Sequence, residues 1–556
     1  MMVAAGYAHA QSQSAPEAGE VPTQARASTD STAESSAPEA PASPIAIDQL
    51  TLSDDMLAAV GVRPIENHRV EALVSSGTDS THHAAVRATD TLAGAGVELT
   101  GTAFRSDVLG DRTAAGARIE HAGEHDVLRA NASYGLDHVG LVRQSFTTDT
   151  STAAYRAAWT GWRAANRFEL QAYGEHTSLR DVRSAAALDL DGDLYGAHAG
   201  LASRRVQAFG LDHEFGGDID ITQATGMSTQ SDGDPALQNM TTLRRTKHAR
   251  KRFLSAYIHD TIRVIESLDV RGGFVFEQWA WLTNINSIYG PDPSENMDND
   301  GPDAIRDLLM GPRVGAIYRA SPEVALEAQA YRQLRTPTWQ QLMRPIQNGN
   351  VLTTADDRLH AATISGAELG PVLTMRSVEA RAKLYWNEIA SPIATVGVAD
   401  DTRAITNLDH ARETGVQAAA TWRVAKPVLA GVDYTFTNAR ITEASAYPQL
   451  AGKQLVQTPR HRATALLAYD APKLATLTGA VRYVDRRFED DRNTIVAKPF
   501  AVVDAMAARK LTHGLAGFVG IENLFDRRYV ANQAGVDTFG APRLVQVGLR
   551  LDSARW

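Results

Sequence analysis

The chain has 556 residues, a formal net charge of −10 and no cysteine. The absence of cysteine excludes disulfide scaffolds and thiolate metal sites, and the acidic balance argues against a nucleic-acid partner, which favours a basic surface. No run of 18 apolar residues occurs, which excludes a membrane-spanning helix. A transmembrane β-barrel remains compatible with this composition, because its strands need apolar residues only at alternate positions.

The first 67 residues differ from the rest in composition and in hydrophobic pattern. Residues 1–10 end in Ala8-His9-Ala10, the small-x-small pattern of a secretory cleavage site, and we interpret them as a signal-peptide remnant because the basic and most of the apolar regions are missing. A chance Ala-rich terminus is the alternative. Residues 11–67 form a Ser/Pro/Ala-rich segment that we predict to be disordered, followed by a short linker in which residues 45–65 hold a strand or helix.

From Arg69 onward, apolar and polar residues alternate. In "VEARAKLYW" (378–386), one face carries Val, Ala, Ala, Leu and Trp, and the other carries Glu, Arg, Lys and Tyr. A period of two with one apolar and one polar face predicts a half-buried strand. The same pattern occurs at residues 126–134, 167–174, 324–331, 416–424 and 545–551.

A β-sandwich and a membrane barrel both satisfy this pattern, and length decides between them. The region from residue 69 holds 556 − 68 = 488 residues, far more than one sandwich. At roughly 22 residues per strand and connection, it gives about 22 strands, a known barrel size. We therefore predict an all-β fold in which residues 68–556 form a large transmembrane antiparallel β-barrel of about 22 strands.

The connections between the strands favour the barrel too. Short turns are predicted at residues 122–125 and 160–166, and longer polar connections at residues 223–248 and 286–307. Short turns at one end and long loops at the other are typical of outer-membrane barrels. His121 and His125 flank one short turn, so we interpret them as hairpin residues and not as metal ligands.

One acidic loop approaches the pattern of a calcium site. Asn296, Asp298 and Asp300 have the i, i+2, i+4 spacing, Gly301 follows, and Asp307 stands at the twelfth position. Hard oxygen ligands at that spacing can enclose Ca²⁺. We favour a solvated acidic loop over a calcium site, because the first ligand is Asn, the last is Asp instead of Glu, and no flanking helices are expected.

Aromatic residues precede the same loop. Trp279, Trp281 and Tyr289 belong either to the aromatic girdle of the barrel or to a ligand site, for which Trp281 and Tyr289 are the candidates. We favour the girdle. No nucleophile elbow and no Walker pattern occurs in the sequence, so we expect neither an enzyme nor a cofactor.

The carboxyl end carries the most specific motifs. "GIENLFDRRYV" (520–530) followed by "GAPRLVQVGLRL" (540–551) resembles the carboxyl end of TonB-dependent outer-membrane receptors. Segments 253–274, 311–345, 407–417 and 450–463 resemble the same family in the same order. The resemblance extends from about residue 68 to 551, which is the whole predicted barrel.

The resemblance assigns structural roles to several residues. The family motif covers Asn523, Leu524, Phe525, Asp526, Tyr529, Gly540, Pro542 and Arg543 near the end of the chain, and Arg335 and Pro337 earlier. We interpret 521–535 as the last periplasmic turn. Asn523 and Asp526 suit a turn because their side chains can bond their own backbone, and Phe525 and Tyr529 suit the aromatic girdle.

The sequence departs from the family before the barrel. TonB-dependent receptors fill the barrel with an amino-terminal plug, but only 68 − 10 = 58 residues separate the predicted cleavage site from the barrel. No plug is recognisable in them. The missing plug leaves open a truncated gene, a separate plug chain or a true open pore.

The resemblance implies a receptor for uptake of a scarce, bulky solute such as a ferric siderophore or cobalamin. The alternatives are a passive porin-like pore and a non-transporting relic or adhesin. The expected partners are outer-membrane lipid, the barrel-insertion machinery, and the TonB system only if a plug is supplied. We expect a monomer without a nucleic-acid partner, exported through the periplasm to the outer membrane of a Gram-negative cell.

Overall fold

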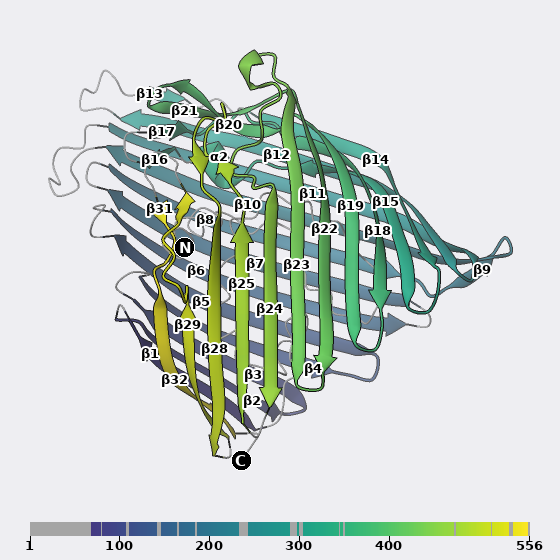
Figure 1. Cartoon of the computed structure of the whole chain (residues 1–556). Coiled ribbons are helices and arrows are strands. Elements are labelled where there is room, and N and C mark those ends of the chain that lie inside the picture. Colours follow the sequence, from purple (N-terminus) through teal and green to yellow (C-terminus); the bar gives the residue numbers. More distant parts are fainter. Residues whose placement is uncertain are drawn as a thin grey trace.

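The computed structural model is shown in Figure 1. It describes residues 68–553, except residues 79, 107–109, 142–145, 164–165, 184–185, 233–242, 290–296, 300–303, 344, 349–350, 472–473, 513 and 533–537. The predicted signal remnant and the predicted disordered segment therefore lie outside the described residues.

Across the described residues, one antiparallel sheet of 24 strands forms the wall of a barrel. Two of these strands, β9 (Val206–Ala208) and β13 (Met297–Asn299), only extend the pairing of β10 and β12, which leaves 24 − 2 = 22 wall strands. The first wall strand pairs with the last, so the sheet closes. The predicted all-β fold, the barrel and the strand number are confirmed.

The wall strands are β1 (Arg69–Gly77), β2 (His82–Leu92), β3 (Ala95–Arg105), β4 (Asp111–Ala122), β5 (Asp126–Leu141), β6 (Phe146–Arg163), β7 (Asn166–Arg183), β8 (Ala186–Ala202), β10 (Leu211–Asp232), β11 (Leu243–Ile265), β12 (Leu268–Tyr289), β14 (Ala304–Arg319), β15 (Val324–Arg335), β18 (Ala362–Thr374), β19 (Val378–Ala390), β22 (His410–Ala425), β23 (Val428–Glu443), β24 (His461–Ala471), β25 (Ala475–Val484), β28 (Phe500–Thr512), β29 (Leu515–Glu522) and β32 (Leu544–Asp552).

Shorter elements lie in the connections. They are α2 (Trp339–Met343), β16 (Ile346–Asn348), β17 (Val351–Thr354), β20 (Ile393–Ala399), β21 (Thr402–Asn407), the 3₁₀ helix η4 (Pro448–Leu450), β26 (Arg487–Phe488), β27 (Val496–Ala497), β30 (Val530–Asn532) and β31 (Thr538–Phe539). In the described part of the chain, no helix is long and apolar enough to cross a bilayer.

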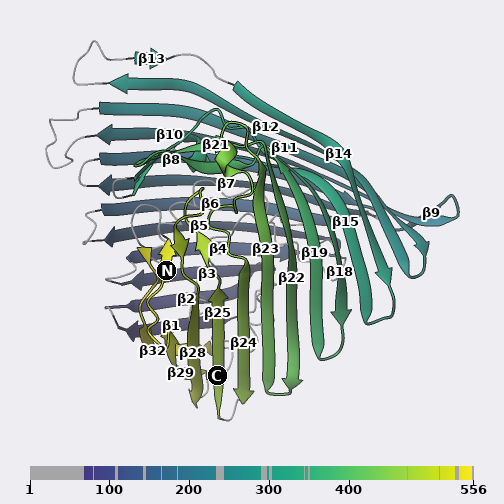
Figure 2. The same cartoon turned by 45° about the horizontal axis from the view of Figure 1, so that its top comes forward.

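The alternation in the sequence sets the two faces of the wall. On β19 the side chains of Leu384 and Trp386 are exposed on the outer face, whereas Lys383 and Tyr385 point inward. Lys383 bonds Glu368 of β18 at 3.2 Å inside the barrel. Successive side chains of a strand point to opposite faces, so an apolar outer band surrounds a polar interior. In Figures 1 and 2 the strands of the near and far walls cross steeply, as tilted barrel strands do.

The two ends of the barrel differ in their connections. The first residue of the wall, Arg69, and its last residue, Asp552, lie at the same end of the barrel. The connections at this end are short turns, such as 123–125. The other end, which we call the long-connection end, carries the segments 336–361, 391–409, 444–460, 485–499 and 523–543. In outer-membrane barrels the long loops are extracellular.

The predicted connections are confirmed in part. The turn predicted at residues 122–125 is confirmed as 123–125, and that at 160–166 shrinks to two residues. The long connection predicted at 223–248 is wrong, because Gln223–Asp232 and Leu243–His248 belong to β10 and β11. The polar residues there extend the strands beyond the apolar band, where the outer face no longer needs apolar side chains.

The wall is uneven in height. Strands β10, β11 and β12 have 22, 23 and 22 residues, and we call them the tall wall. Strands β29 and β32 have 8 and 9 residues, and the strands that close the barrel next to them, β1 to β4, have 9 to 12. We call β29, β32 and β1 to β4 the closing wall.

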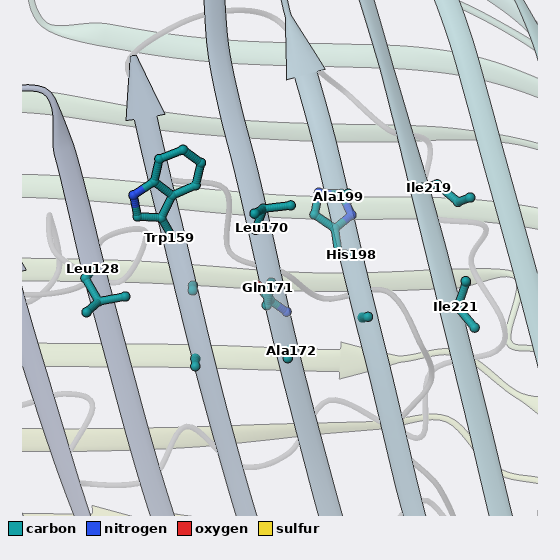
Figure 3. Close-up of a pocket in the computed structure, with 12 residues that line it drawn as sticks. Leu128, Trp159, Leu170, Gln171, Ala172, His198, Ala199, Ile219 and Ile221 are labelled. Carbon is teal, nitrogen blue, oxygen red and sulfur yellow. The ribbon is translucent and has the colours of Figure 1, made fainter. Parts of the chain in front are cut away.

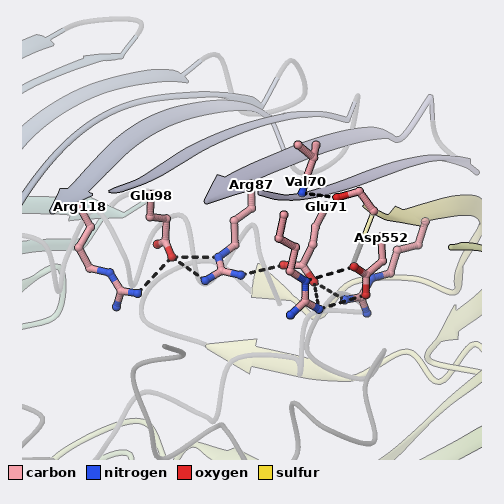
Figure 4. A network of polar contacts seen from close by, with 9 residues as sticks. Val70, Glu71, Arg87, Glu98, Arg118 and Asp552 are labelled. Atoms are coloured by element: carbon pink, nitrogen blue, oxygen red, sulfur yellow. Dashed lines mark hydrogen bonds and ion pairs between the residues drawn. The ribbon is translucent and has the colours of Figure 1, made fainter. Parts of the chain in front are cut away.

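A ladder of ion pairs crosses the closing wall on its inner face (Figure 4). Its members are Arg118, Glu98, Arg87, Glu71, Arg69, Asp552 and Arg550. Arg87 of β2 donates to Glu98 at 2.7 Å and to Glu71 at 3.0 Å. Glu71 of β1 also accepts from Arg550 of β32 at 3.0 Å, so one carboxylate joins three strands at the seam.

Candidate functional site

The long connections pack together over the long-connection end of the barrel. We call residues 336–361, 391–409, 444–460 and 485–499 the loop layer (Figure 2). Its centre is a four-stranded sheet in the order β16-β17-β21-β20, in which β17 and β21 run parallel. This sheet combines strands of two different connections, so the segments 336–361 and 391–409 form one unit.

Side-chain to backbone hydrogen bonds join the other connections to this unit. Asn407 donates to the carbonyl oxygens of His360 and Ser391 at 3.0 and 2.8 Å. The amide of Gly397 donates to the Asp491 carboxylate at 3.0 Å. Asn493 pairs with the backbone of Gln454, accepting at 2.7 Å and donating at 3.0 Å. The four connections are therefore linked in a continuous series.

A carboxylate organises the turn in the last of these connections. Asp490 accepts hydrogen bonds from the amides of Thr494 at 2.8 Å and Ile495 at 2.6 Å. Its other oxygen accepts from the Thr494 hydroxyl at 2.7 Å. Burial raises the pKa of Asp490, but these donors outweigh that effect and leave the pKa below its ordinary value.

The segment 336–361 packs against the inner face of the tall wall. Trp339 at the start of α2 contacts Trp281 of β12 edge to face, with ring centroids 5.2 Å apart. On β10, Gly226 lies under the Trp339 indole, and a Cβ at this position would collide with the ring. Lys251 of β11 donates to the Pro337 carbonyl oxygen at 3.0 Å. This segment thus covers an apolar area inside the barrel.

The placement of the tryptophans corrects the girdle interpretation. Trp279 and Trp281 are both 0% exposed and belong to the cluster that contacts Trp339, on the inner face with Glu277. They lie two and four residues from that glutamate along β12. Residues with an even spacing on a strand share one face, so the sequence already indicated an inner position. Trp281 is therefore inaccessible to a solute in this arrangement. Tyr289 ends β12, and its side chain lies outside the described residues.

The family-motif turn is held by one buried asparagine. Asn523 has a φ of 50°, in the left-handed region that asparagine tolerates. Its side-chain amide donates to the carbonyl oxygens of Arg527 and Ala541 at 3.0 Å each. Its side-chain oxygen accepts from the Arg527 amide at 2.7 Å, and its own amide donates to Asp504 at 2.9 Å. The predicted bonding of Asn523 to its neighbouring backbone is confirmed.

Other motif residues complete this connection. Asp526 has a φ of 51° and accepts from the Arg543 amide at 2.9 Å. The Leu524 amide donates to the Val503 carbonyl oxygen at 2.7 Å. Pro542 is exposed beside Arg543. Because the connection joins β29 to β32 at the long-connection end, the interpretation of a last periplasmic turn is wrong.

The two aromatic motif residues do not form a girdle. Tyr529 is buried and stacks on Phe500 with ring centroids 4.1 Å apart, and burial raises the pKa of its phenol to about 12. Its ring lies against Gly540, where a Cβ would collide with it. Phe525 is 74% exposed in the turn. The girdle assignment is therefore wrong for Tyr529, which packs within the connection.

The remaining motif residues lie at the start of the loop layer. Arg335 is the last residue of β15 and is exposed. Pro337 is buried two residues later, and its carbonyl oxygen receives the Lys251 ammonium described above. The Arg-Thr-Pro segment thus marks where the chain leaves the wall and enters the barrel.

The residues of the calcium prediction are not placed together by the described structure. Asn296 and Asp300 lie outside the described residues. Asp298 lies in β13, and its side chain is also outside them. Asp307 of β14 faces inward, where it accepts from the Ala361 amide at 2.7 Å and pairs with His360 at 2.8 Å. Within the described residues, no group of three candidate ligands could hold a metal.

Residues 72–524 match the family model described as the TonB dependent receptor-like β-barrel. The chain belongs to the family of TonB-dependent receptors. It is 30% identical over 156 residues to the ferrioxamine B receptor of Salmonella typhimurium (strain SL1344), which is 26% of this chain and 22% of that receptor. The match thus spans less than a quarter of the relative's length.

Solved TonB-dependent receptors share the fold. The ferric-catecholate import receptor Fiu of E. coli K12 in its closed form superposes with a TM-score of 0.72 at 13% identity, over 88% of this chain and 82% of that one. The ferric yersiniabactin uptake receptor FyuA of Yersinia pestis gives 0.70 at 15%, over 88% and 81%. The copper transporter OprC gives 0.71 at 15%, over 88% and 82%. At these identities the likeness shows the fold alone.

Membership in this family settles the broad class of the protein. TonB-dependent receptors are transport receptors of the Gram-negative outer membrane and not enzymes. This membership does not favour a passive pore or a non-transporting relic. Sequence reasoning missed several residues that connect segments distant in the chain, above all Trp339, Asn407 and Asn493. The sequence contained a signal only for the inner position of Trp281, namely its even spacing from Glu277.

Proposed function

We propose that this chain forms the barrel of a receptor for TonB-dependent uptake of a ferric siderophore. The observation that carries the proposal is the 156-residue match to a ferrioxamine B receptor within a TonB-dependent receptor barrel. The name of that relative, a ferrioxamine B receptor, favours this substrate class over cobalamin. The TonB system and a plug are proposed partners of the whole protein, and the barrel-insertion machinery and a monomeric state stay predictions.

The loop layer suits the capture of a bulky polar solute. It lies at the extracellular end of the barrel, and its exposed charged side chains include Arg358, Asp400, Asp401, Arg486 and Arg492. The segment 336–361 contacts the rest of the loop layer through β17 and the inner wall through Trp339. A solute that displaces this segment would change the surroundings of three tryptophans, so their fluorescence can report binding.

The test is a titration of the full chain, folded in a neutral detergent, with ferric ferrioxamine B. We expect saturable quenching of tryptophan fluorescence by the ferric complex, weaker binding of iron-free desferrioxamine B, and no binding of cyanocobalamin. Uptake of radioactive iron from ferrioxamine B by cells that lack other siderophore receptors tests transport by the whole protein. Binding of cyanocobalamin, or equal binding of the iron-free compound, would contradict the proposal.

A further inference from the structure

A row of tyrosines marks the upper border of the apolar band on the outer face. Tyr134 of β5, Tyr155 of β6 and Tyr195 of β8 are each about half exposed, and they lie on the outer face with the apolar residues below them. Tyrosines on the outer face of a barrel mark the membrane interface. On β10, Gln223 pairs with Tyr195 and continues this row.

Arginines on β11 and β14 continue this row, and a third arginine on β11 lies beside it. Arg252 of β11 pairs with Gln223 on one side and with Ala280 of β12 on the other. Ala280 pairs in turn with Arg306 of β14, so Arg252 and Arg306 stand two strands apart, about 10 Å between Cα atoms. Arg250 is the next residue of β11 whose side chain faces outward, about 7 Å along the strand from Arg252. We call Arg250, Arg252 and Arg306 the arginine patch.

The positive charges of the patch are not neutralised by the protein. In the part of the chain that the structure describes, Arg250 and Arg306 have no ion-pair partner, and Arg252 bonds only the neutral Gln223, at 2.9 Å. The Nε atom of Arg250 is buried without a hydrogen-bond partner. The nearest carboxylate in register, Asp193, lies two strands from Arg250 and pairs with His176 at 3.0 Å.

Several other charged residues on the inner and outer faces are paired. On the outer face, Arg180 of β7 lies 3.7 Å from Asp189. The ladder of the closing wall pairs all its arginines. Guanidinium groups stay protonated, so the patch carries three positive charges without an ion-pair partner among the described residues.

We propose that the arginine patch binds the phosphate of a lipid headgroup in the outer leaflet. The patch lies on the outer face, away from the solute path, where the apolar outer residues of β11 and β14 end. The next residues of these strands that face outward, on the side of the bilayer core, are apolar. Leu254 follows Arg252 on β11, and Leu308 follows Arg306 on β14. Arginines bind phosphate oxygens through paired N–H donors.

The outer face beside the patch also accommodates acyl chains. Leu254 pairs with Ile221, and Ile219 and Ile221 form one end of an apolar groove of about 450 Å³ (Figure 3). The groove crosses β5 to β10 over small side chains such as Ala157 and Ala197. A lipid whose phosphate contacts the patch therefore has apolar surface directly below its headgroup.

The test measures lipid binding by the full chain folded in a neutral detergent. Dihexanoyl phosphatidic acid is titrated by calorimetry into the wild type, the triple variant R250Q/R252Q/R306Q and the control Arg180→Gln. We expect saturable binding by wild type and control, and binding at least about tenfold weaker in the triple variant. Heat-modifiable migration on gels verifies that each variant is folded. If the triple variant does not fold, Arg306→Gln alone should weaken binding about threefold.

Two results would overturn the proposal. One is an unchanged affinity for phosphatidic acid in the folded arginine variants. The other is displacement of the lipid by inorganic phosphate at equal concentration, which would make the patch a site for free anions. Phosphatidylcholine of the same chain length should bind at least about tenfold more weakly than phosphatidic acid, because its choline cation opposes the patch.

Discussion

The inner faces of the tall wall and the closing wall are built from opposite kinds of side chain. Near the long-connection end, the tall wall presents Trp279 and Trp281, which are buried by the segment 336–361. Near the short-turn end, the closing wall presents the ion-pair ladder centred on Glu71. A barrel interior is expected to be polar; the closing wall follows that expectation along its ladder, whereas the tall wall departs from it where the segment 336–361 packs on it.

The difference shows that local cover decides the chemistry of the interior. Where protein covers the inner face, apolar side chains gain from leaving water. Where strands are joined across the seam and no described segment covers them, charged side chains hold their neighbours and stay compatible with a wet lumen. The sequence pattern of a strand therefore identifies its outer face more safely than its inner face.

The largest effect should come from removing the cover of the tall wall. Trp339→Ala should cost about 3–5 kcal/mol in the docking of 336–361, because a buried indole is lost from a packed cluster. Faster proteolysis of that segment, with unchanged heat-modifiable migration of the barrel, measures it. Trp386→Ala on the outer face is the matched control and should leave 336–361 protected. Unchanged protection in Trp339→Ala would contradict the role of this cluster.

The outer face should respond to charge regardless of what covers the inner face. Leu384→Arg should lower the free energy of unfolding by about 2–4 kcal/mol, because Leu384 is 58% exposed on the outer face of β19. Lys383→Ala should cost less than about 1 kcal/mol, since it removes one partly exposed ion pair inside the barrel. Urea unfolding in lipid vesicles measures both. Equal effects would mean that the two faces are wrongly assigned.

The closing wall should be most sensitive at the carboxylate shared by three strands. Glu71→Gln should cost about 1.5–3 kcal/mol, because charge-assisted bonds to Arg69, Arg87 and Arg550 weaken together in a buried site. Glu120→Gln, which affects one partly exposed pair with Arg129, should cost less than about 1 kcal/mol. The midpoint of heat-modifiable migration compares the two. If the ladder does not stabilise the barrel, Glu71→Gln and Glu120→Gln should have equal midpoints.

The smallest effect concerns pH and the loop layer. The pKa of Asp490 lies below its ordinary value, so its stabilisation of the turn is complete above the unfolded pKa of about 3.9 and is lost as pH falls through the folded pKa. Hydrogen-exchange protection of the Thr494 and Ile495 amides should fall on acidification. In Asp490→Asn, protection should be lower at neutral pH and should not change with acid. The same acid response in both proteins would exclude this carboxylate as its cause.

Much of the fold was predictable from the sequence. Strict alternation, as in residues 378–386, identified strands because the outer face must be apolar in lipid. The chain length then gave the number of strands. The pattern failed for 223–248, where β10 and β11 extend beyond the apolar band and both faces carry polar residues. It also failed for the connection 523–543. The end of the barrel at which this connection lies follows only from a correct count of all the strands before it.

The site was less predictable than the wall. Bonding by Asn523 followed from its type and its place in a turn, which are local properties. The parallel pairing of β17 with β21 and the bond between Gly397 and Asp491 join segments of different connections, and no local pattern contains such contacts. Trp281 was misassigned to the girdle, although its even spacing from Glu277 placed both on one face.

The seam between β1 and β32 also has a consequence for how the chain folds. The ion pair of Arg69 with Asp552 joins residues 483 positions apart, so this contact can form only after nearly the whole wall has been synthesised. Until then β1 keeps an unpaired edge, which can pair with another chain. Closing so long a segment is entropically costly and slow. A chain truncated before β32 should therefore retain two open edges and aggregate, however well its other strands pair.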